Sequence, residues 1–141
     1  MDVFVKTISA STAELEVELQ MMAYKYGFAP KIISIKKESA VYHVSMEHIG
    51  EGTSLADVYG ENAEDIPNYV WARIRYMVQT LLEEEGIEYI DVTPYNFLEK
   101  NGRVYMIDFG DALYSTPNAD INWYLQDFVY DEENMWNPDF K

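Results

Sequence analysis

The sequence predicts a single domain, residues 1–141, of mixed α/β (α+β) class, in which a small antiparallel sheet with one helix precedes a short helical part. Three observations predict this fold class. Strand, helix and hairpin patterns follow one another in residues 1–50, a long amphipathic pattern follows Pro67, and a second hairpin pattern surrounds Asn101-Gly102. The length fits one domain with its own core, because domains are commonly about 100–200 residues long.

The first elements alternate between strand and helix. β-Branched and aromatic residues predict a strand over 3–8. A helix is predicted over 13–26, with Gly27 ending it. Apolar residues recur along this helix at helical spacing and are expected to form its buried face: Leu15, Leu19, Met22 and Tyr26. Segments 31–36 and 41–46 alternate in polarity, which predicts a hairpin of two strands.

The second part of the chain is expected to be more helical. Segment 50–53 is predicted to be a loop, and a long helix is predicted between Pro67 and Gly86. One stripe of this helix is apolar: Val70, Trp71, Ile74, Met77, Val78, Leu81 and Leu82. Asn-Gly between apolar runs predicts the second hairpin, and a last helix is expected near 120–130, before a tail at Asn137-Pro138.

The charge balance restricts the partners that this chain can bind directly. It has 25 acidic and 10 basic residues, a formal net charge of -15. Such a surface repels nucleic acid and also ATP, so a nucleotide site must create its own positive field with lysine and metal ions. The absence of cysteine fits a reducing compartment. Without a signal-like start or a long apolar run, we expect a soluble, cytoplasmic protein with no membrane partner.

The residues most suggestive of chemistry lie in two segments, 86–98 and 107–110. Phosphoryl transfer requires a carboxylate to orient the attacking hydroxyl, and oxygen ligands for Mg²⁺. Asp91 could orient the hydroxyl, while Asn96, five residues on, and Asp108, after a strand, could reach the metal. Asp111 is expected to be solvated, and His43 and His48 have no matching ligands for zinc. A structural alternative stays open, because Asp91 and Asn96 are also typical turn residues.

The spacing of these segments resembles the catalytic core of protein kinases. In that family the corresponding stretch reads Gly-Ile-x-His-Arg-Asp-Leu-x-Pro-x-Asn-Ile-Leu, then a hairpin, then Asp-Phe-Gly. Two segments resemble those of the compact atypical kinases of the RIO and Bud32 kind: Met46-Glu47-His48-Ile49-Gly50 and Asp91-Val92-Thr93-Pro94. The resemblance implies a minimal two-lobed fold, with a reduced N-lobe and hinge over about 1–50 and a reduced C-lobe over about 51–141.

The resemblance also implies the roles of individual residues around ATP and Mg²⁺. Lys6 would contact the nucleotide phosphates and pair with a glutamate of the next helix, for which Glu16 is preferred over Glu18 and Glu14. Alternatively, Lys6 is an ordinary lysine of an edge strand. Met46 would be the gatekeeper, and the backbone of Glu47 and Ile49 would bind adenine. Asn96 and Asp108 would hold the metal, Asp91 would be catalytic, and Asp120 would steady the catalytic loop.

Several features depart from the kinase pattern. The sequence begins at the lysine strand, without the strands of the Gly-rich phosphate loop, and Gly50-Glu51-Gly52 follows the hinge and cannot replace that loop. Tyr89-Ile90 replaces the usual His-Arg, and Thr93 stands where Ser/Thr kinases usually have lysine. After Gly110 there is no Ala-Pro-Glu motif and no room for the helices that bind peptide substrates.

Three functions therefore remain in view. The first is an ATP- and Mg²⁺-dependent phosphotransferase acting on a Ser/Thr hydroxyl of a protein substrate or on itself. The second is a pseudokinase that acts as an interaction module, with homodimerisation as an option. Trimmed chains of this kind are ones that viruses encode, and a viral origin is kept as a hypothesis. The third function, an acidic decoy of basic proteins, rests on charge alone and leaves the ordered motifs unexplained.

Overall fold

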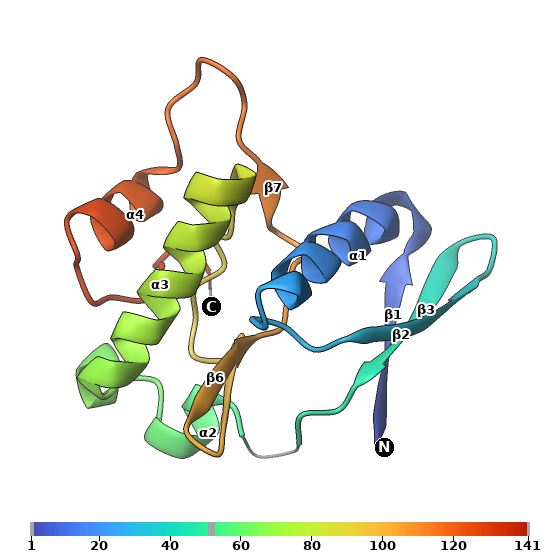
Figure 1. The fold of residues 1–141 in the computed structure, drawn as a ribbon, viewed down its shortest axis with the longest axis horizontal. Coiled ribbons are helices and arrows are strands. Elements are labelled where there is room, and N and C mark those ends of the chain that lie inside the picture. Colours follow the sequence, from blue (N-terminus) through green and yellow to red (C-terminus); the bar gives the residue numbers. More distant parts are fainter. Residues whose placement is uncertain (1, 51–52, 141) are drawn as a thin grey trace.

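The computed structural model describes residues 2–50 and 53–140. Glu51 and Gly52 of the loop predicted at 50–53 lie outside the described residues. The first part of the chain forms β1 (Val3–Ser9), α1 (Ala10–Lys25), β2 (Ile32–Lys37) and β3 (Val41–Glu47). These strands make one antiparallel sheet in the order β1-β3-β2, and α1 crosses one face of it (Figure 1). The predicted strand, helix and hairpin are all present.

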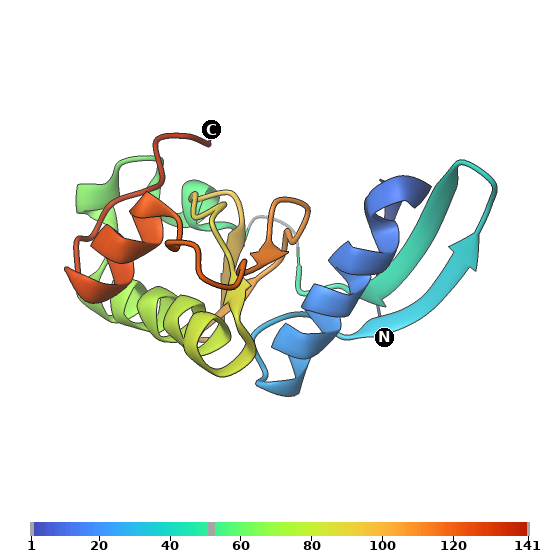
Figure 2. The same cartoon turned by 90° about the horizontal axis from the view of Figure 1, so that it is seen from above.

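The second part is built around one long helix and two small strand pairs. Its elements are α2 (Leu55–Tyr59), a 3₁₀ turn (Ala63–Asp65), α3 (Asn68–Glu85), β4 (Ile87–Glu88), β5 (Phe97–Lys100), β6 (Arg103–Met106), β7 (Leu113–Tyr114), α4 (Trp123–Leu125) and a π-helical turn (Gln126–Tyr130). Strands β5 and β6 form the predicted hairpin, and β4 pairs with β7. The two parts lie side by side in Figure 2.

The long helix α3 agrees with its sequence pattern in detail. All residues of the predicted apolar stripe are buried. Gly86 ends the helix with a left-handed φ of 65°, a conformation that glycine adopts without the steric cost of a Cβ atom. By contrast, the predicted helix near 120–130 is confined to α4 and the π-helical turn, which together span 123–130.

The buried face of α1 differs from the prediction. Leu15 and Tyr26 are 44% and 38% exposed, and the helix begins at Ala10 rather than Ala13. The buried residues are Ala13, Glu16, Val17, Leu19, Gln20 and Ala23. Two of these are polar but have partners, because Glu16 binds Lys6 and Gln20 donates to the Pro30 carbonyl. Paired polar groups can be buried at little cost, so the face that contacts the sheet is not the most apolar one.

Two hydrophobic cores stabilise the molecule. The smaller one lies between α1 and the sheet and contains Ile8, Ala13, Val17, Val44 and Met46. The larger one surrounds α3 and also receives Leu19, Ala23, Phe28 and Ala29 from the first part of the chain. The C-terminal half of α1 therefore packs on the larger core. The sheet and the helical part are held together by this shared packing.

Candidate active site

A cleft of about 390 Å³ lies between the sheet and the β5–β6 hairpin. Its walls are mainly apolar at one end and polar at the other. The apolar lining comes from Phe4, Pro30, Met46, Ile49, Leu98 and Ile107, with Glu47 and His48 beside Ile49. Lys6, Asn96 and Asp108 provide the polar groups of the other end. Phe4 was not among the residues predicted from the sequence, although strand alternation indicates it, because Phe4 and Lys6 are two residues apart and share a face of β1.

The polar end of the cleft is organised around Lys6. Its Nζ lies 2.6 Å from Glu16 Oε2 and 3.5 Å from Asp108 Oδ1. Burial alone would lower the pKa of Lys6, but the two carboxylates outweigh it and raise the pKa above its usual value. The ammonium group is therefore held charged between a helix and the loop after β6.

The three glutamates of α1 have different contacts. Glu16 is buried and is the one that contacts Lys6, whereas Glu14 accepts a hydrogen bond from the Tyr42 hydroxyl at 3.3 Å. Glu18 accepts a hydrogen bond from the hydroxyl of Tyr114 on β7 at 2.5 Å. Of the three candidates that the sequence leaves open, Glu16 therefore has the geometry of the lysine partner.

Gly110 lies close to the carboxylates of both Asp108 and Glu16. Its amide donates to Asp108 Oδ1 at 2.9 Å. A Cβ atom at this position would lie 3.2 Å from that oxygen and 3.3 Å from Glu16 Oε1. These distances are tighter than ordinary contacts, so a larger residue would require the two carboxylates to shift by a few tenths of an ångström.

Asp91 and Asn96 lie on the loop between β4 and β5. The Asn96 Nδ2 atom donates to the backbone carbonyl of Asp91 at 3.0 Å, and the Asn96 carbonyl accepts from Ile107 at 3.0 Å. Burial raises the pKa of Asp91 to about 6, and the nearby Asp108 and Asp111 carboxylates contribute to the rise. The loop thus brings the amide of Asn96 and a carboxyl with a raised pKa toward the segment after β6 that carries Asp108.

The aromatic residues under this loop form a closed layer. Tyr89 is fully buried and contacts the rings of Phe109 and Phe97, with centroids 5.2 Å and 5.8 Å apart. Burial raises its pKa well above the usual value, so the hydroxyl stays neutral. Thr93 is 3% exposed, so its side chain does not face the cleft as a lysine at that position would. The two departures from the kinase motif are both parts of the packed interior.

The sequence predicted a tail around Asn137, but the structure shows that this segment anchors the Asp91 loop. Asn137 is 1% exposed; its Nδ2 donates to the Ile90 carbonyl at 2.8 Å and its amide donates to the Val92 carbonyl at 2.9 Å. The two bonds flank Asp91. Asp120, expected to steady this loop, is exposed. Asn137 was not predicted as a functional residue, because Asn-Pro is also a typical turn sequence.

The segment from Met46 to Ile49 connects the two parts and borders the cleft. Met46 is 5% exposed and accepts a contact from Gln20 Nε2 at 3.5 Å through its sulfur. The amide of Glu47 donates to the Lys31 carbonyl at 2.9 Å. A ligand could therefore use the Glu47 carbonyl and the Ile49 amide, but not the Glu47 amide.

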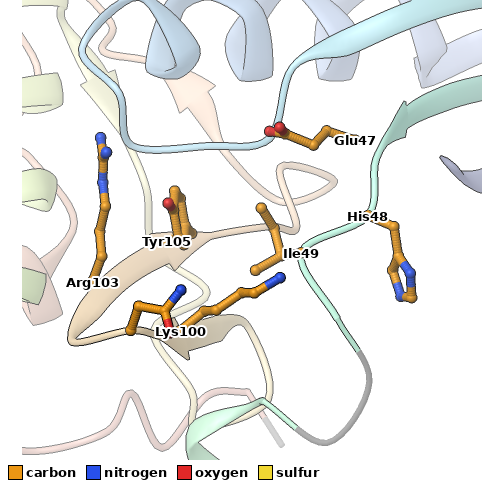
Figure 3. A pocket seen from close by; sticks show the side chains of 7 residues that line it. Glu47, His48, Ile49, Lys100, Arg103 and Tyr105 are labelled. Atoms are coloured by element: carbon orange, nitrogen blue, oxygen red, sulfur yellow. The ribbon is translucent and has the colours of Figure 1, made fainter. Parts of the chain in front are cut away.

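A second hollow, of about 310 Å³, lies on the outer side of this segment. Figure 3 shows Lys100, Arg103 and Tyr105 of the β5–β6 hairpin on one side of this hollow, and Glu47, His48 and Ile49 on the other. Arg103 is already engaged, because its Nη2 donates to the Gly27 carbonyl at 2.9 Å. This hollow therefore includes a contact that joins the hairpin to the turn after α1.

Comparison with known proteins agrees with this geometry. The chain is 28% identical over 126 residues to a protein of Archaeoglobus fulgidus named probable serine/threonine-protein kinase BUD32 homolog. The match covers 86% of this chain, which spans 64% of the length of that relative. The RIO domain family matches residues 3–129, from β1 to the π-helical turn. The fold is thus a minimal kinase-like one, and the chain belongs to the RIO domain family.

Proposed function

We propose that this protein is an ATP- and Mg²⁺-dependent phosphotransferase of the protein-kinase type. One observation carries the proposal: the Lys6–Glu16 ion pair and Asp108 meet at the polar end of a cleft that is otherwise lined mainly by apolar side chains. An ATP molecule has the same division, with a flat base at one end and phosphates at the other. The family supports a kinase-like function in general terms.

The apolar end of the cleft suits a nucleotide base. Phe4 and Met46 from the sheet and Leu98 and Ile107 from the hairpin side would enclose its two faces. The edge of adenine would bind the carbonyl of Glu47 and the amide of Ile49, because the Glu47 amide is engaged by Lys31. Among the described residues, the structure records no backbone partner for the Ile49 amide.

The polar end suits phosphate groups and magnesium. Lys6 is the one lysine or arginine that lines the cleft in the described parts of the chain. The Asn96 amide nitrogen is used by the Asp91 carbonyl, which leaves the Oδ1 atom of Asn96 as a ligand beside the Asp108 carboxylate. One carboxylate and one amide oxygen fit Mg²⁺, because this ion completes its shell with water and phosphate oxygens. When bound, the metal would neutralise the charge that develops on the phosphates.

Asp91 is suited to orient an attacking hydroxyl. With a pKa of about 6, its carboxyl is ionised at neutral pH and yet basic enough to accept a proton. The phosphoacceptor would be a Ser/Thr hydroxyl, on a protein substrate or on the chain itself. The roles of Asp91, Asn96 and Asp108 follow the division of labour in kinase-type transfer.

Calorimetric titration of ATP with and without Mg²⁺ tests this proposal. Wild-type protein is expected to bind ATP in a Mg²⁺-dependent manner, and Asp108→Ala is expected to lose both the metal dependence and phosphate transfer. Asp111→Ala is the matched control for ATP binding only, since Asp111 is an exposed carboxylate of the same loop that does not line the cleft but does affect the pKa of Asp91. Equal Mg²⁺-dependent binding by wild type and Asp108→Ala would refute the assignment.

A pseudokinase is the second candidate, and the burial of Thr93 favours it. At 3% exposure this side chain contributes nothing to the cleft at a position where Ser/Thr kinases usually have a lysine. In this alternative the cleft binds nucleotide weakly or not at all, and the fold serves a protein partner. Absence of binding at millimolar ATP would favour this interaction module over the enzyme.

A further inference from the structure

The two edges of the three-stranded sheet differ in their protection. Strand β2 forms one edge and carries a bulge between Ile32 and Ser34, followed by Lys36 and Lys37. Bulges and edge lysines are common means by which proteins prevent another strand from pairing. Strand β1 forms the other edge, and its pairing with β3 is regular from Val3 to Ser9. The β1 edge thus lacks the bulge that interrupts the β2 edge.

The side chains of β1 also favour pairing with another strand. Val3, Phe4 and Val5 are 49%, 48% and 54% exposed. The one charged residue among Val3–Ser9 is Lys6, whose ammonium turns into the cleft toward Glu16. Neither proline nor an outward lysine therefore shields this edge. An apolar strand edge without such protection is expected to be covered by another strand.

The hydrogen-bond pattern identifies which backbone groups are free to pair. The His48 amide donates to the Asp2 carbonyl, which continues the register in which Phe4 pairs with Met46 and Lys6 with Val44. Hydrogen-bonded and non-hydrogen-bonded pairs alternate in antiparallel sheets, so Phe4 and Lys6 direct their N–H and C=O groups toward β3. The corresponding groups of Val3, Val5 and Thr7 then point away from the sheet, at the edge.

We propose that the β1 edge is a homodimer interface, in which β1 of a second copy pairs antiparallel across a twofold axis at Val5. In this register Val5 pairs with Val5 of the other copy, and Val3 pairs with Thr7. Each pair exchanges two backbone hydrogen bonds, so the outward groups of all three residues are satisfied. The two sheets become one continuous sheet.

The second copy fits this edge because the edge is complementary to itself. Between the hydrogen-bonded pairs, Phe4 of each copy faces Lys6 of the other on the cleft side of the sheet. The ring of Phe4 can pack on the aliphatic stem of that Lys6 while the Lys6 ammonium stays with Glu16. The valines at the axis meet on the outer face, where each is otherwise half exposed. Each copy would also contribute Phe4 to the rim of the other copy's cleft, and this holds whether or not the protein is an enzyme.

A matched pair of valine substitutions tests the interface in the full chain. Val5→Lys places two ammonium groups opposite each other at the axis, and is expected to weaken dimerisation about 100-fold, because like charges directly opposite are destabilising. Val58→Lys on α2 makes the same chemical change at a valine that is 49% exposed, compared with 54% for Val5, and is expected to leave the dimer unchanged. Light scattering after size exclusion, over a range of concentrations, reports the masses, and circular dichroism checks that both variants fold.

Hydrogen exchange identifies the edge directly. In the dimer, the amides of Val3, Val5 and Thr7 are expected to be protected, and dilution is expected to release them. Val5→Pro removes an outward donor and is also expected to yield a monomer with an intact sheet. A wild-type monomer at high micromolar concentration would overturn the proposal. A dimer that persists in Val5→Lys, or whose Val3, Val5 and Thr7 amides exchange freely, would also overturn it.

Discussion

The two walls of the cleft are stabilised by different interactions. The sheet-side wall, with Lys6 and Glu16, rests on the small core and on a partly exposed ion pair; the Lys6 side chain is 32% exposed. The loop-side wall, with Asp91 and Asn96, lies over the larger core and is tied by two hydrogen bonds from Asn137. Stability is therefore concentrated under the proposed catalytic loop, whereas the proposed phosphate-binding end depends mainly on electrostatics.

The largest loss of unfolding free energy is expected from Asn137→Ala, which tests the loop-side wall. This change removes the donor to the Ile90 carbonyl and leaves that partly buried group without its partner, which costs about 2 kcal/mol of unfolding free energy. Because the bonds flank Asp91, kcat is also expected to fall more than the affinity for ATP. Urea unfolding and steady-state kinetics measure the two effects.

Asn134→Ala is the control for this substitution. Asn134 accepts a hydrogen bond from Arg75 at 2.6 Å, but the contact is exposed, so its loss is expected to change stability by less than about 1 kcal/mol. If both variants lose the same stability, the chain end is not an anchor of the loop. If Asn137→Ala loses stability with an unchanged kcat, the anchor is structural and does not position Asp91.

The loop also illustrates what the sequence could predict and what it could not. Local signals were sufficient for α3, since Pro67, the apolar stripe and Gly86 each act within one helix. They were sufficient for the β5–β6 hairpin as well, because Asn101-Gly102 determines its turn. They failed for Asn137, whose burial depends on carbonyl groups 47 residues away in the case of Ile90.

Polar partners explain the error at α1 in the same way. Leu15 and Tyr26 are the more apolar residues, yet Glu16 and Gln20 take the buried face because Lys6 and Pro30 provide partners for them. Apolar periodicity has no information about such long-range pairing. The Lys6–Glu16 contact itself followed from a resemblance to kinases and not from a local pattern. Its role in nucleotide binding stays a prediction.

Asp91→Asn is expected to change the unfolding free energy by an intermediate amount and in the opposite direction, toward greater stability. Burial raises the pKa of Asp91 to about 6, so the folded protein carries an unfavourable charge at neutral pH. Removing that charge is expected to stabilise the fold by about 1 kcal/mol at about pH 7, a value reduced for solvent screening at this partly exposed carboxyl. The same variant is expected to lose phosphate transfer.

The pH dependence of this gain provides its control. Between the unfolded pKa near ~4 and the folded pKa of about 6, the folded wild type binds more protons than the unfolded chain. Stability of the wild type therefore falls as pH rises through this window, and the advantage of Asp91→Asn should disappear near its lower end. Urea unfolding across the window measures this. A gain of equal size at both ends would mean that the carboxyl charge is not its cause.

The smallest change in stability, but a clear change in function, is expected from Glu16→Gln. The glutamine oxygen can still accept a hydrogen bond from Lys6, and the Lys6 side chain is 32% exposed, so unfolding free energy should change by less than about 1 kcal/mol. Without the charge of Glu16, however, Lys6 is drawn toward Asp108, and Mg²⁺-ATP affinity is expected to fall about tenfold. Glu18→Gln, on the same helix but bound to Tyr114, should leave that affinity unchanged. If calorimetry instead finds equal losses of Mg²⁺-ATP affinity in both variants, the general charge of α1 controls nucleotide binding. If Glu16→Gln loses as much unfolding free energy as Asn137→Ala, both walls depend on buried polar contacts to the same degree.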